Sequence, residues 1–300
     1  MARKTYTPQR RDAARAARAE KVEQMHDELT AAASALTKSG EWRRWLEFLG
    51  SFHRYSFNNT LLIQVQCPHA TQVAGFKAWQ AKGRQVRKGE KSIRIFGKPL
   101  RLVSETDEAT GEKTRKAVPC PPPVVSVFDI SQTDPIEGVE QPECPAVALQ
   151  GDDHAALYDR TAAWMTAQGW TVTREQIPGE TNGFCTVDGT RRIVVAADLS
   201  DAHAAKTLIH ETAHAILHTD DDGRLTTEPD TATRELEAES VAYVVAGLHN
   251  LDTSDYSIGY VASWSGGEAD KVKATAVRVQ EAVHLIIEAL GDDHTEEDAG

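Results

Sequence analysis

Apolar and polar positions in the first seventy residues follow a helical repeat. A segment rich in Ala, Arg and Glu runs from about Arg10 to Lys38 with Leu29, Ala33 and Leu36 at helical spacing, which predicts a helix. A second apolar stripe has the spacing i, i+3, i+4 and i+7 and consists of Trp42, Trp45, Leu46 and Leu49. Ser56 suits the N-cap of a third helix that continues to Pro68.

The repeat changes after Gly83. Short alternating runs at 93–96 and 124–128, separated by turn-forming residues, predict strands and hairpins. The stretch from 133 to 145 has four acidic residues, three prolines and no periodicity, which indicates a domain boundary. We therefore expect a basic helical extension at 1–40, a first domain at 41–132 and a linker at 133–150.

A second domain is predicted at 151–290. It begins with a helix over about 153–168, whose core stripe we assign to Leu157, Ala163 or Trp164, and Ala167. Strands at 184–187 and 192–196 flank the hairpin signal Asp188-Gly189, and Ser200-Asp201 then supplies an N-cap for a helix that reaches His218. Residues 291–300 are mostly acidic and predict a disordered tail. The fold class is therefore α+β, with two domains.

Charge is divided unevenly along the 300 residues, whose net value is -12. Residues 1–100 hold 19 Lys and Arg against 8 Asp and Glu (+11), which leaves 14 against 37 (-23) for residues 101–300. The first part suits a polyanionic partner such as a nucleic acid. The charged N-terminus and the lack of a long apolar run predict a cytoplasmic protein without a membrane span. Four scattered cysteines (Cys67, Cys120, Cys144, Cys185) suggest free thiols.

The chemistry of the second domain centres on His210-Glu211-Thr212-Ala213-His214. On a helix the two histidines project from one face a turn apart, so they can share one tetrahedral ion. A zinc ion bound in this way leaves a coordination site for water and lowers the pKa of that water toward about 7, and a neighbouring carboxylate takes the proton. Glu211 is the natural general base. An ordinary helix with two unrelated histidines is the competing interpretation.

The next helix supplies acids that can complete such a site. It reads from Thr231 to Tyr243, and Glu235 and Glu239 share one face while Glu237 points elsewhere. This spacing resembles the gluzincin metallopeptidases, in which a Glu about twenty residues past the second His is the third ligand. The resemblance implies that Glu235 is that ligand and that Glu239 hydrogen-bonds a ligand imidazole. From the sequence, Glu237 or Glu239 as third ligand stays an alternative, and His218 is interpreted as a helix-end residue favoured by the dipole.

Two longer sequence segments restrict the resemblance to particular groups of these peptidases. His-Glu-Thr-Ala-His-Ala-Ile-Leu-His and Glu-Leu-Glu-Ala-Glu-Ser-Val-Ala-Tyr are similar to the ImmA/IrrE peptidases and to the C-terminal domain of ArdC-type antirestriction proteins, over roughly 153–290. The resemblance implies a zincin-like metallopeptidase domain of narrow specificity. The second half is closer to the ImmA/IrrE style than to the plasmid proteins. Candidates for an oxyanion-stabilising residue are Tyr243, Tyr260 and His249.

The first domain interleaves aromatic and basic residues, which suits unpaired bases and phosphates. The basic turn at 83–91 favours an anion-binding loop over a solvated hairpin. The phrases at 55–63, 74–79 and 83–91 resemble the N-terminal domain of ArdC-type proteins over about 41–130, which implies an α+β domain that binds single-stranded DNA (ssDNA) with little sequence preference. The predicted contact residues are Asn59, Arg84, Arg87, Lys88 and Lys91.

Together these features predict an ssDNA-binding, metal-dependent peptidase that acts on an unidentified protein substrate. Zn²⁺ is the expected metal by availability, and two imidazoles with one carboxylate also accept Mn²⁺ or Co²⁺. The alternative is a non-catalytic ssDNA-binding antirestriction protein that protects incoming plasmid or phage DNA and has a structural metal site. The presence of Glu211 favours the enzyme, because a structural site needs no general base.

Overall fold

The computed structural model describes residues 8–106, 113–139, 154–254 and 268–291. The chain divides into two compact units: residues up to 30 and 62–142 belong to the first, and residues 31–61 and 143–295 to the second. The α+β class and the two-domain organisation are as expected. The units do not follow the predicted boundaries, because residues 41–61, assigned from the sequence to the first domain, group with the second unit.

The first unit holds most of α1 (Pro8–Ala35), the end of α3 (Phe57–Gln66) and several short strands. The middle strand of its three-stranded antiparallel sheet is β6 (Val124–Asp129), between β1 (Val73–Gly75) and β3 (Ile93–Phe96). Helix α4 (Phe76–Ala81) buries Trp79, whose indole N–H donates to the carbonyl of Phe128 at 2.8 Å. This bond satisfies the buried indole and fixes α4 on the sheet.

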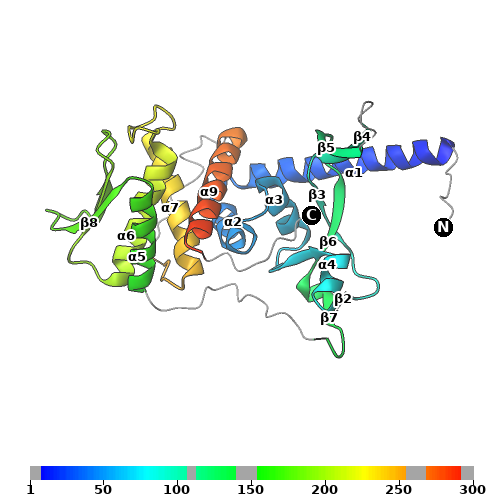
Figure 1. The fold of residues 1–300 in the computed structure, drawn as a ribbon, viewed down its shortest axis with the longest axis horizontal. Coiled ribbons are helices and arrows are strands. Elements are labelled where there is room, and N and C mark those ends of the chain that lie inside the picture. Colours follow the sequence, from blue (N-terminus) through cyan, green and yellow to red (C-terminus); the bar gives the residue numbers. More distant parts are fainter. Residues whose placement is uncertain (1–7, 107–112, 140–153, 255–267, 292–300) are drawn as a thin grey trace. The chain divides into compact units, whose positions relative to one another are not determined.

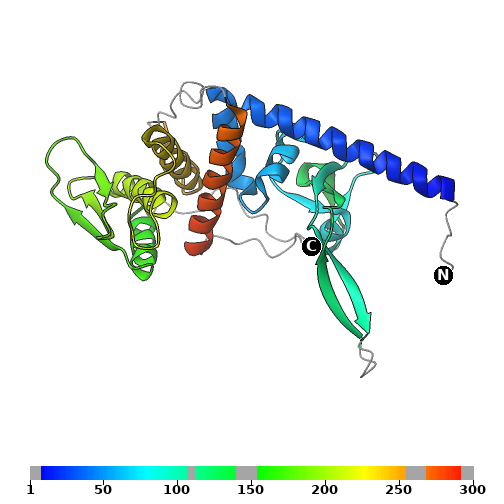
Figure 2. The same ribbon diagram turned by 90° about the horizontal axis from the view of Figure 1, so that it is seen from above.

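Two further pairs of strands complete this unit. β4 (Leu100–Thr106) and β5 (Lys113–Pro119) form an antiparallel ribbon, which extends away from the three-stranded sheet in Figure 2. β2 (Arg84–Val86) pairs with β7 (Thr133–Pro135), and a single 3-10 turn, η1 (Ile130–Gln132), joins β6 to β7. The linker predicted to begin at residue 133 therefore starts later. Its first residues are held by backbone hydrogen bonds to β2, which the local composition did not reveal.

The second unit contains a layer of helices in which α5 (His154–Ala167), α6 (Asp201–His218), α7 (Thr231–Leu248) and α9 (Ala269–Ala289) follow one another (Figure 1). Helix α2 (Ser39–Phe52) packs on α7. The indole N–H of Trp42 donates to Ser240 Oγ at 3.0 Å, and both side chains are fully buried. The stripe of apolar residues that predicted α2 is therefore covered by α7, which explains why this segment belongs to the second unit.

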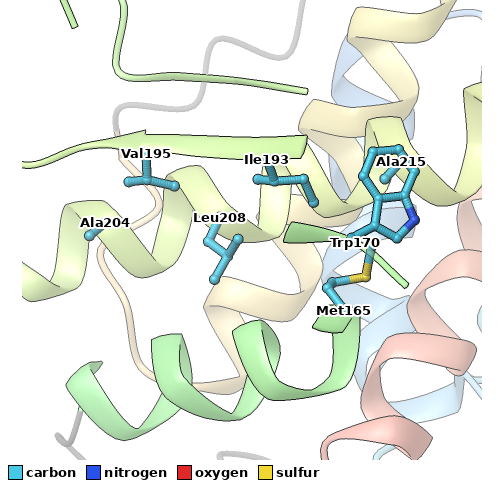
Figure 3. Packing of buried hydrophobic residues seen from close by; sticks show 7 residues of the cluster. All are labelled: Met165, Trp170, Ile193, Val195, Ala204, Leu208 and Ala215. Atoms are coloured by element: carbon cyan, nitrogen blue, oxygen red, sulfur yellow. The ribbon is translucent and has the colours of Figure 1, made fainter. Parts of the chain in front are cut away.

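A three-stranded sheet packs against α6. β10 (Arg192–Ala196) lies between β8 (Thr171–Glu175), which is parallel to it, and β9 (Gly183–Cys185), which is antiparallel. The hairpin around Asp188-Gly189 is present, with a first strand shorter than predicted. Side chains from α5, β10 and α6 converge in one core (Figure 3), formed by Met165, Trp170, Ile193, Val195, Ala204, Leu208 and Ala215.

Three details differ from or extend the sequence analysis. The stripe that α5 buries is Leu157, Thr161 and Met165, at i, i+4 and i+8, whereas Ala163 and Ala167 are exposed. Cys67, Cys120 and Cys185 are free thiols, and Cys144 and the predicted tail from residue 292 lie outside the described residues. Among the described helices none is both long and apolar enough to cross a membrane.

Candidate metal centre

The two helices that carry the predicted ligands have well-defined starts. Ser200 Oγ accepts a hydrogen bond from the backbone N–H of His203 at 3.3 Å and begins α6. The Asp230 carboxylate accepts from the N–H of Thr233 at 3.0 Å and begins α7. These caps satisfy N–H groups that a helix leaves without an intrahelical partner, and they set the phase of each helix.

Three side-chain atoms meet between α6 and α7. Nε2 of His210 and Nε2 of His214 are 3.1 Å apart. Glu235 Oε2 is 3.7 Å from the first nitrogen and 3.6 Å from the second. Two ligands held about 2.0–2.1 Å from a tetrahedral ion are about 3.3 Å apart, so the observed spacing fits a zinc-sized divalent cation. Of the three acids on α7, the one nearest both Nε2 atoms is Glu235, the acid that the resemblance implied.

The Glu235 side chain keeps this cluster accessible. It is 60% exposed, whereas the side chains of His210 and His214 are 23% and 16% exposed. A site lined by two shielded imidazoles and one exposed carboxylate leaves room for water and for a larger molecule on the solvent side.

Glu211 lies beside the cluster and is buried. Its carboxylate accepts a hydrogen bond from the backbone N–H of Cys185 in β9. Burial raises the pKa of Glu211, and the neighbouring histidines oppose that rise. Gly183 allows this approach of β9 to α6, since a Cβ at that position would lie 2.6 Å from Thr207 Cγ2 and 3.4 Å from Glu211 Cγ. The edge strand and the expected general base are thus in direct contact.

Glu239 contacts the first histidine from its other side. Its Oε2 is 3.3 Å from Nδ1 of His210, the nitrogen that does not face the cluster. Burial lowers the pKa of His210, but the hydrogen bond to Glu239 and the charges of Glu211, Glu239 and Glu235 outweigh burial, so the pKa is raised. The position of Glu239 is the one that the resemblance implied for an acid that orients a ligand ring.

The second histidine has a different partner. Nδ1 of His214 lies 3.0 Å from Nδ1 of His218, whose Nε2 lies 3.0 Å from Oε2 of Glu237. Arg278 of α9 donates from Nε to the other Glu237 oxygen at 2.7 Å. His218 was interpreted from the sequence as a helix-end residue stabilised by the dipole, but it is 1% exposed and the structure places it in a buried hydrogen-bonded chain. Burial lowers the pKa of His218.

Sequence reasoning missed Arg278 and the roles of His218 and Glu237: Glu237 stayed an alternative third ligand, whereas in the structure it binds His218 and Arg278. A signal existed for His218, which follows His214 by one helical turn and therefore shares its face. Glu237 was correctly placed off the face shared by Glu235 and Glu239, but its partners come from other helices. Arg278 had no local signal, because only the packing of α9 on α7 brings it there.

The oxyanion candidates lie elsewhere on α7 or beyond it. The Tyr243 hydroxyl donates to Glu47 Oε1 of α2 at 3.3 Å, so it is engaged on the α2 side of the helix. His249 follows the last residue of α7, about 20 Å along the helix axis from Glu235 at about 1.5 Å per residue. Tyr260 is outside the described residues.

The predicted DNA contacts differ in accessibility. The Arg84 guanidinium donates to the hydroxyl of Thr133 at 2.7 Å, and Arg87 donates to the carbonyl of Ser131 and pairs with Glu90. These two arginines therefore tie β2 to the segment around β7. Lys88 and Lys91 are exposed in the turn that follows β2.

Asn59 is placed differently from the other predicted DNA contacts. It is 9% exposed and belongs to the second unit, whereas the basic turn belongs to the first.

Comparison with known proteins assigns both parts of the chain. Residues 19–128 match the model for the N-terminal domain of the anti-restriction factor ArdC, and residues 165–258 match the model for the IrrE N-terminal-like domain, peptidase family M78. An uncharacterised protein of Bacillus anthracis is 25% identical over 282 residues, covering 81% of this chain and 46% of that relative. The chain thus spans about half the length of the curated relative it matches.

Two solved structures are also similar. They are the metal-free and Mn(II)-bound forms of the antirestriction protein ArdC from plasmid R388, with 21% and 20% identity and TM-scores of 0.46 and 0.41. Each covers 80% of this chain, which covers 87% and 90% of the respective structure. The two family matches agree with the resemblances found in the sequence. The chain therefore matches two family models in succession, that of the ArdC N-terminal domain and that of the IrrE N-terminal-like domain.

Proposed function

We propose that this chain is a metal-dependent peptidase that also binds single-stranded DNA. The observation that carries the proposal is the cluster of His210, His214 and Glu235 with the Glu211 carboxylate beside it. Two imidazoles and one carboxylate suit Zn²⁺, and they also accept Mn²⁺ or Co²⁺. When bound, such an ion supplies Lewis acidity that lowers the pKa of water toward about 7 and polarises a carbonyl.

The residues of the chain supply the remaining chemistry. Glu211 takes the proton of the attacking water and returns it to the leaving amine, which is general base and then general acid catalysis. The Cys185 N–H holds one side of the carboxylate, so the carboxylate keeps its orientation toward the cluster. Because Glu211 is buried, few waters compete with the reacting one.

The neighbouring strand offers a way to bind a peptide. Among the described strands β9 pairs with β10 alone, so its other edge carries backbone groups without a strand partner. An extended peptide can add to such an edge by main-chain hydrogen bonds. Since the backbone of Cys185 donates to Glu211 and Gly183 leaves only enough space for a hydrogen beside it, a peptide bound there would pass beside the general base. An extended segment of a protein is therefore the proposed substrate.

The DNA-binding part of the proposal rests on the ArdC-type domain and on the exposed basic turn. Lys88 and Lys91 are the contacts that we retain first, because their ammonium groups are accessible to phosphates. Arg84 and Arg87 stay in the proposal with a second role in holding β2. Asn59 is the least accessible of the predicted contacts.

One experiment separates catalysis from DNA binding. The purified chain, loaded with Zn²⁺, is incubated with a peptide library made from a bacterial proteome, with and without ssDNA, and new N-termini are identified by mass spectrometry. Glu211→Gln should keep metal and ssDNA binding while cleavage falls by about 10²–10⁴-fold. Asp201→Asn is the matched control, because it changes an exposed acid to its amide at the first residue of the same helix.

The test of DNA binding uses the same protein preparations. Lys88→Ala with Lys91→Ala should weaken ssDNA binding and reduce the slope of log K against log salt by about 0.7 for each lost phosphate contact. Lys77→Ala, an exposed lysine of α4 in the same unit, is the control. Metal and ssDNA binding without any cleavage by the wild-type chain would instead favour the non-catalytic antirestriction function.

A further inference from the structure

The two histidines of the metal cluster are held by different kinds of partner. Nδ1 of His210 faces Glu239, an acid with a quarter of its side chain exposed. Nδ1 of His214 faces the ring of His218, which is 1% exposed. A carboxylate can always accept a hydrogen bond from a histidine ring. The nitrogen of another imidazole can accept one only in the tautomer in which that nitrogen carries no proton.

The distances define where each proton lies. If His214 binds a metal through Nε2, its neutral ring carries a proton on Nδ1, which donates to Nδ1 of His218. That nitrogen of His218 is then the acceptor, so the proton of its ring is on Nε2 and donates to Glu237 Oε2. No other arrangement satisfies both 3.0 Å contacts with neutral rings and an ionised Glu237.

At the far end of the hydrogen-bonded chain, Glu237 has a cationic partner in place of solvent. Its side chain is 0% exposed, and burial of an unpaired carboxylate is strongly unfavourable. Arg278 binds the oxygen that His218 leaves free, through both Nε and a terminal nitrogen. A guanidinium cannot be deprotonated in a protein, so it fixes Glu237 as a pure acceptor.

We propose that His218, Glu237 and Arg278 are positioning residues that hold His214 in its metal-binding tautomer and orientation. Each transmits its effect through the next: Arg278 fixes Glu237, Glu237 fixes His218, and the acceptor nitrogen of His218 takes the Nδ1 proton of His214. Helix α9, which contributes no ligand, therefore contributes to metal affinity. This inference rests on the proposed function of the metal cluster.

A purely structural role makes a different prediction. If the three residues only join α6, α7 and α9, then their substitution lowers stability and leaves the metal affinity of the folded protein unchanged. The chain offers a matched control for helix joining: Lys271 of α9 binds Asp230 of α7 at 3.0 Å without touching the metal cluster. Lys271→Met removes a cationic link between the same two helices.

The test compares wild type, His218→Phe, Glu237→Gln and Lys271→Met as purified full-length proteins stripped of metal. Dissociation constants for Zn²⁺ and Co²⁺ are measured by competition with a chelator, at a temperature where circular dichroism shows every variant folded. The His218 and Glu237 variants should bind about 10–100-fold more weakly, and Lys271→Met should stay within about twofold of wild type. Wild-type affinity in folded His218→Phe and Glu237→Gln overturns the proposal.

A second test of the proposal uses the wild-type protein alone and so does not require that any variant folds. Nitrogen-15 NMR of the histidine rings in the Zn²⁺-loaded chain should give the Nδ1–H tautomer for His214 and the Nε2–H tautomer for His218. An Nδ1–H tautomer at His218 overturns the proposal even if no variant folds. The metal-site proposal itself fails by a separate result, namely that wild type binds no more Zn²⁺ than His210→Ala with His214→Ala.

Discussion

A single methyl group added at Gly183 in β9 would test the contact between this edge strand and Glu211, the proposed general base. An added Cβ would lie 2.6 Å from Cγ2 of Thr207, 2.9 Å from the carbonyl oxygen of Val194 and 3.4 Å from Cγ of Glu211. Carbon atoms pack best at about 3.5–4.0 Å, so the first contact is about 1 Å too short. Thr207 is β-branched and lies within α6, which restricts rotation of its side chain out of the way.

The expected cost follows from this overlap. Because the Val194 carbonyl is backbone and cannot rotate away, Gly183→Ala must shift β9 from α6, and overpacking of this kind costs about 1–3 kcal/mol. At about 2–4 °C for each kcal/mol, the melting temperature of the second unit should fall by roughly 2–12 °C. The same shift pulls the Cys185 N–H from the Glu211 carboxylate, so activity should fall more than metal affinity.

Thermal and urea unfolding of the full-length chain provide the assay. Gly40→Ala is the control, since a Cβ there meets nothing within 4 Å and alanine favours the helix by up to about 1 kcal/mol. Thr207→Ser removes the methyl group in the shortest contact, so the double variant with Gly183→Ala should recover part of the lost stability. Stability of Gly183→Ala within about 0.5 kcal/mol of wild type would refute the close approach of β9 to Glu211.

Three further predictions concern other parts of the second unit. Burial lowers the pKa of His53 to about 4, so the unfolded chain binds an extra proton between that pH and 6.5. The free energy of unfolding should therefore fall by roughly 3 kcal/mol at most as pH falls from 6.5 toward 4, and His53→Leu should lack this part of the pH dependence in urea titrations across the range. Trp42→Phe removes the donor to Ser240 and should cost about 1–2 kcal/mol, while equal stability would contradict the packing of α2 on α7. Asp230→Ala should cost about 1 kcal/mol by removing the cap of α7, and Asp230→Asn should restore most of it.

The part of the site predicted from sequence is the part fixed by local geometry. His210 and His214 are four residues apart on one helix, so helix formation alone brings their rings together. Which of the three acids on α7 joins the two histidines depends on how α7 packs on α6. From the sequence, only the family resemblance suggested Glu235. The roles of Gly183 and Arg278 depend on contacts between segments far apart in sequence, which no local pattern reports.

The same reasoning applies to the basic turn of the first domain. The composition of the turn at 83–91 indicates solvent exposure. Arg84 is instead half-buried and donates to Thr133 on β7, the strand that pairs with β2, whereas Arg87 is exposed and donates to Ser131 just before that strand. That pairing joins residues about fifty positions apart and was hidden inside the predicted linker. Lys88 and Lys91 lie in the turn after β2 and are exposed, as the composition predicted.

The burial of Glu237 in α7 indicates that this acid serves the proposed metal site and not the stability of the fold. The helix buries Leu236, Ala238 and most residues after them, so an apolar residue at 237 would pack without a desolvation cost. Glu237 nevertheless lies in the interior and pairs with Arg278, and removing one partner of a buried ion pair typically costs about 3–5 kcal/mol. A well-packed hydrophobic pair usually serves stability as well or better. The buried charge therefore supports a role in holding His218 and, through it, His214, the second of the proposed metal ligands.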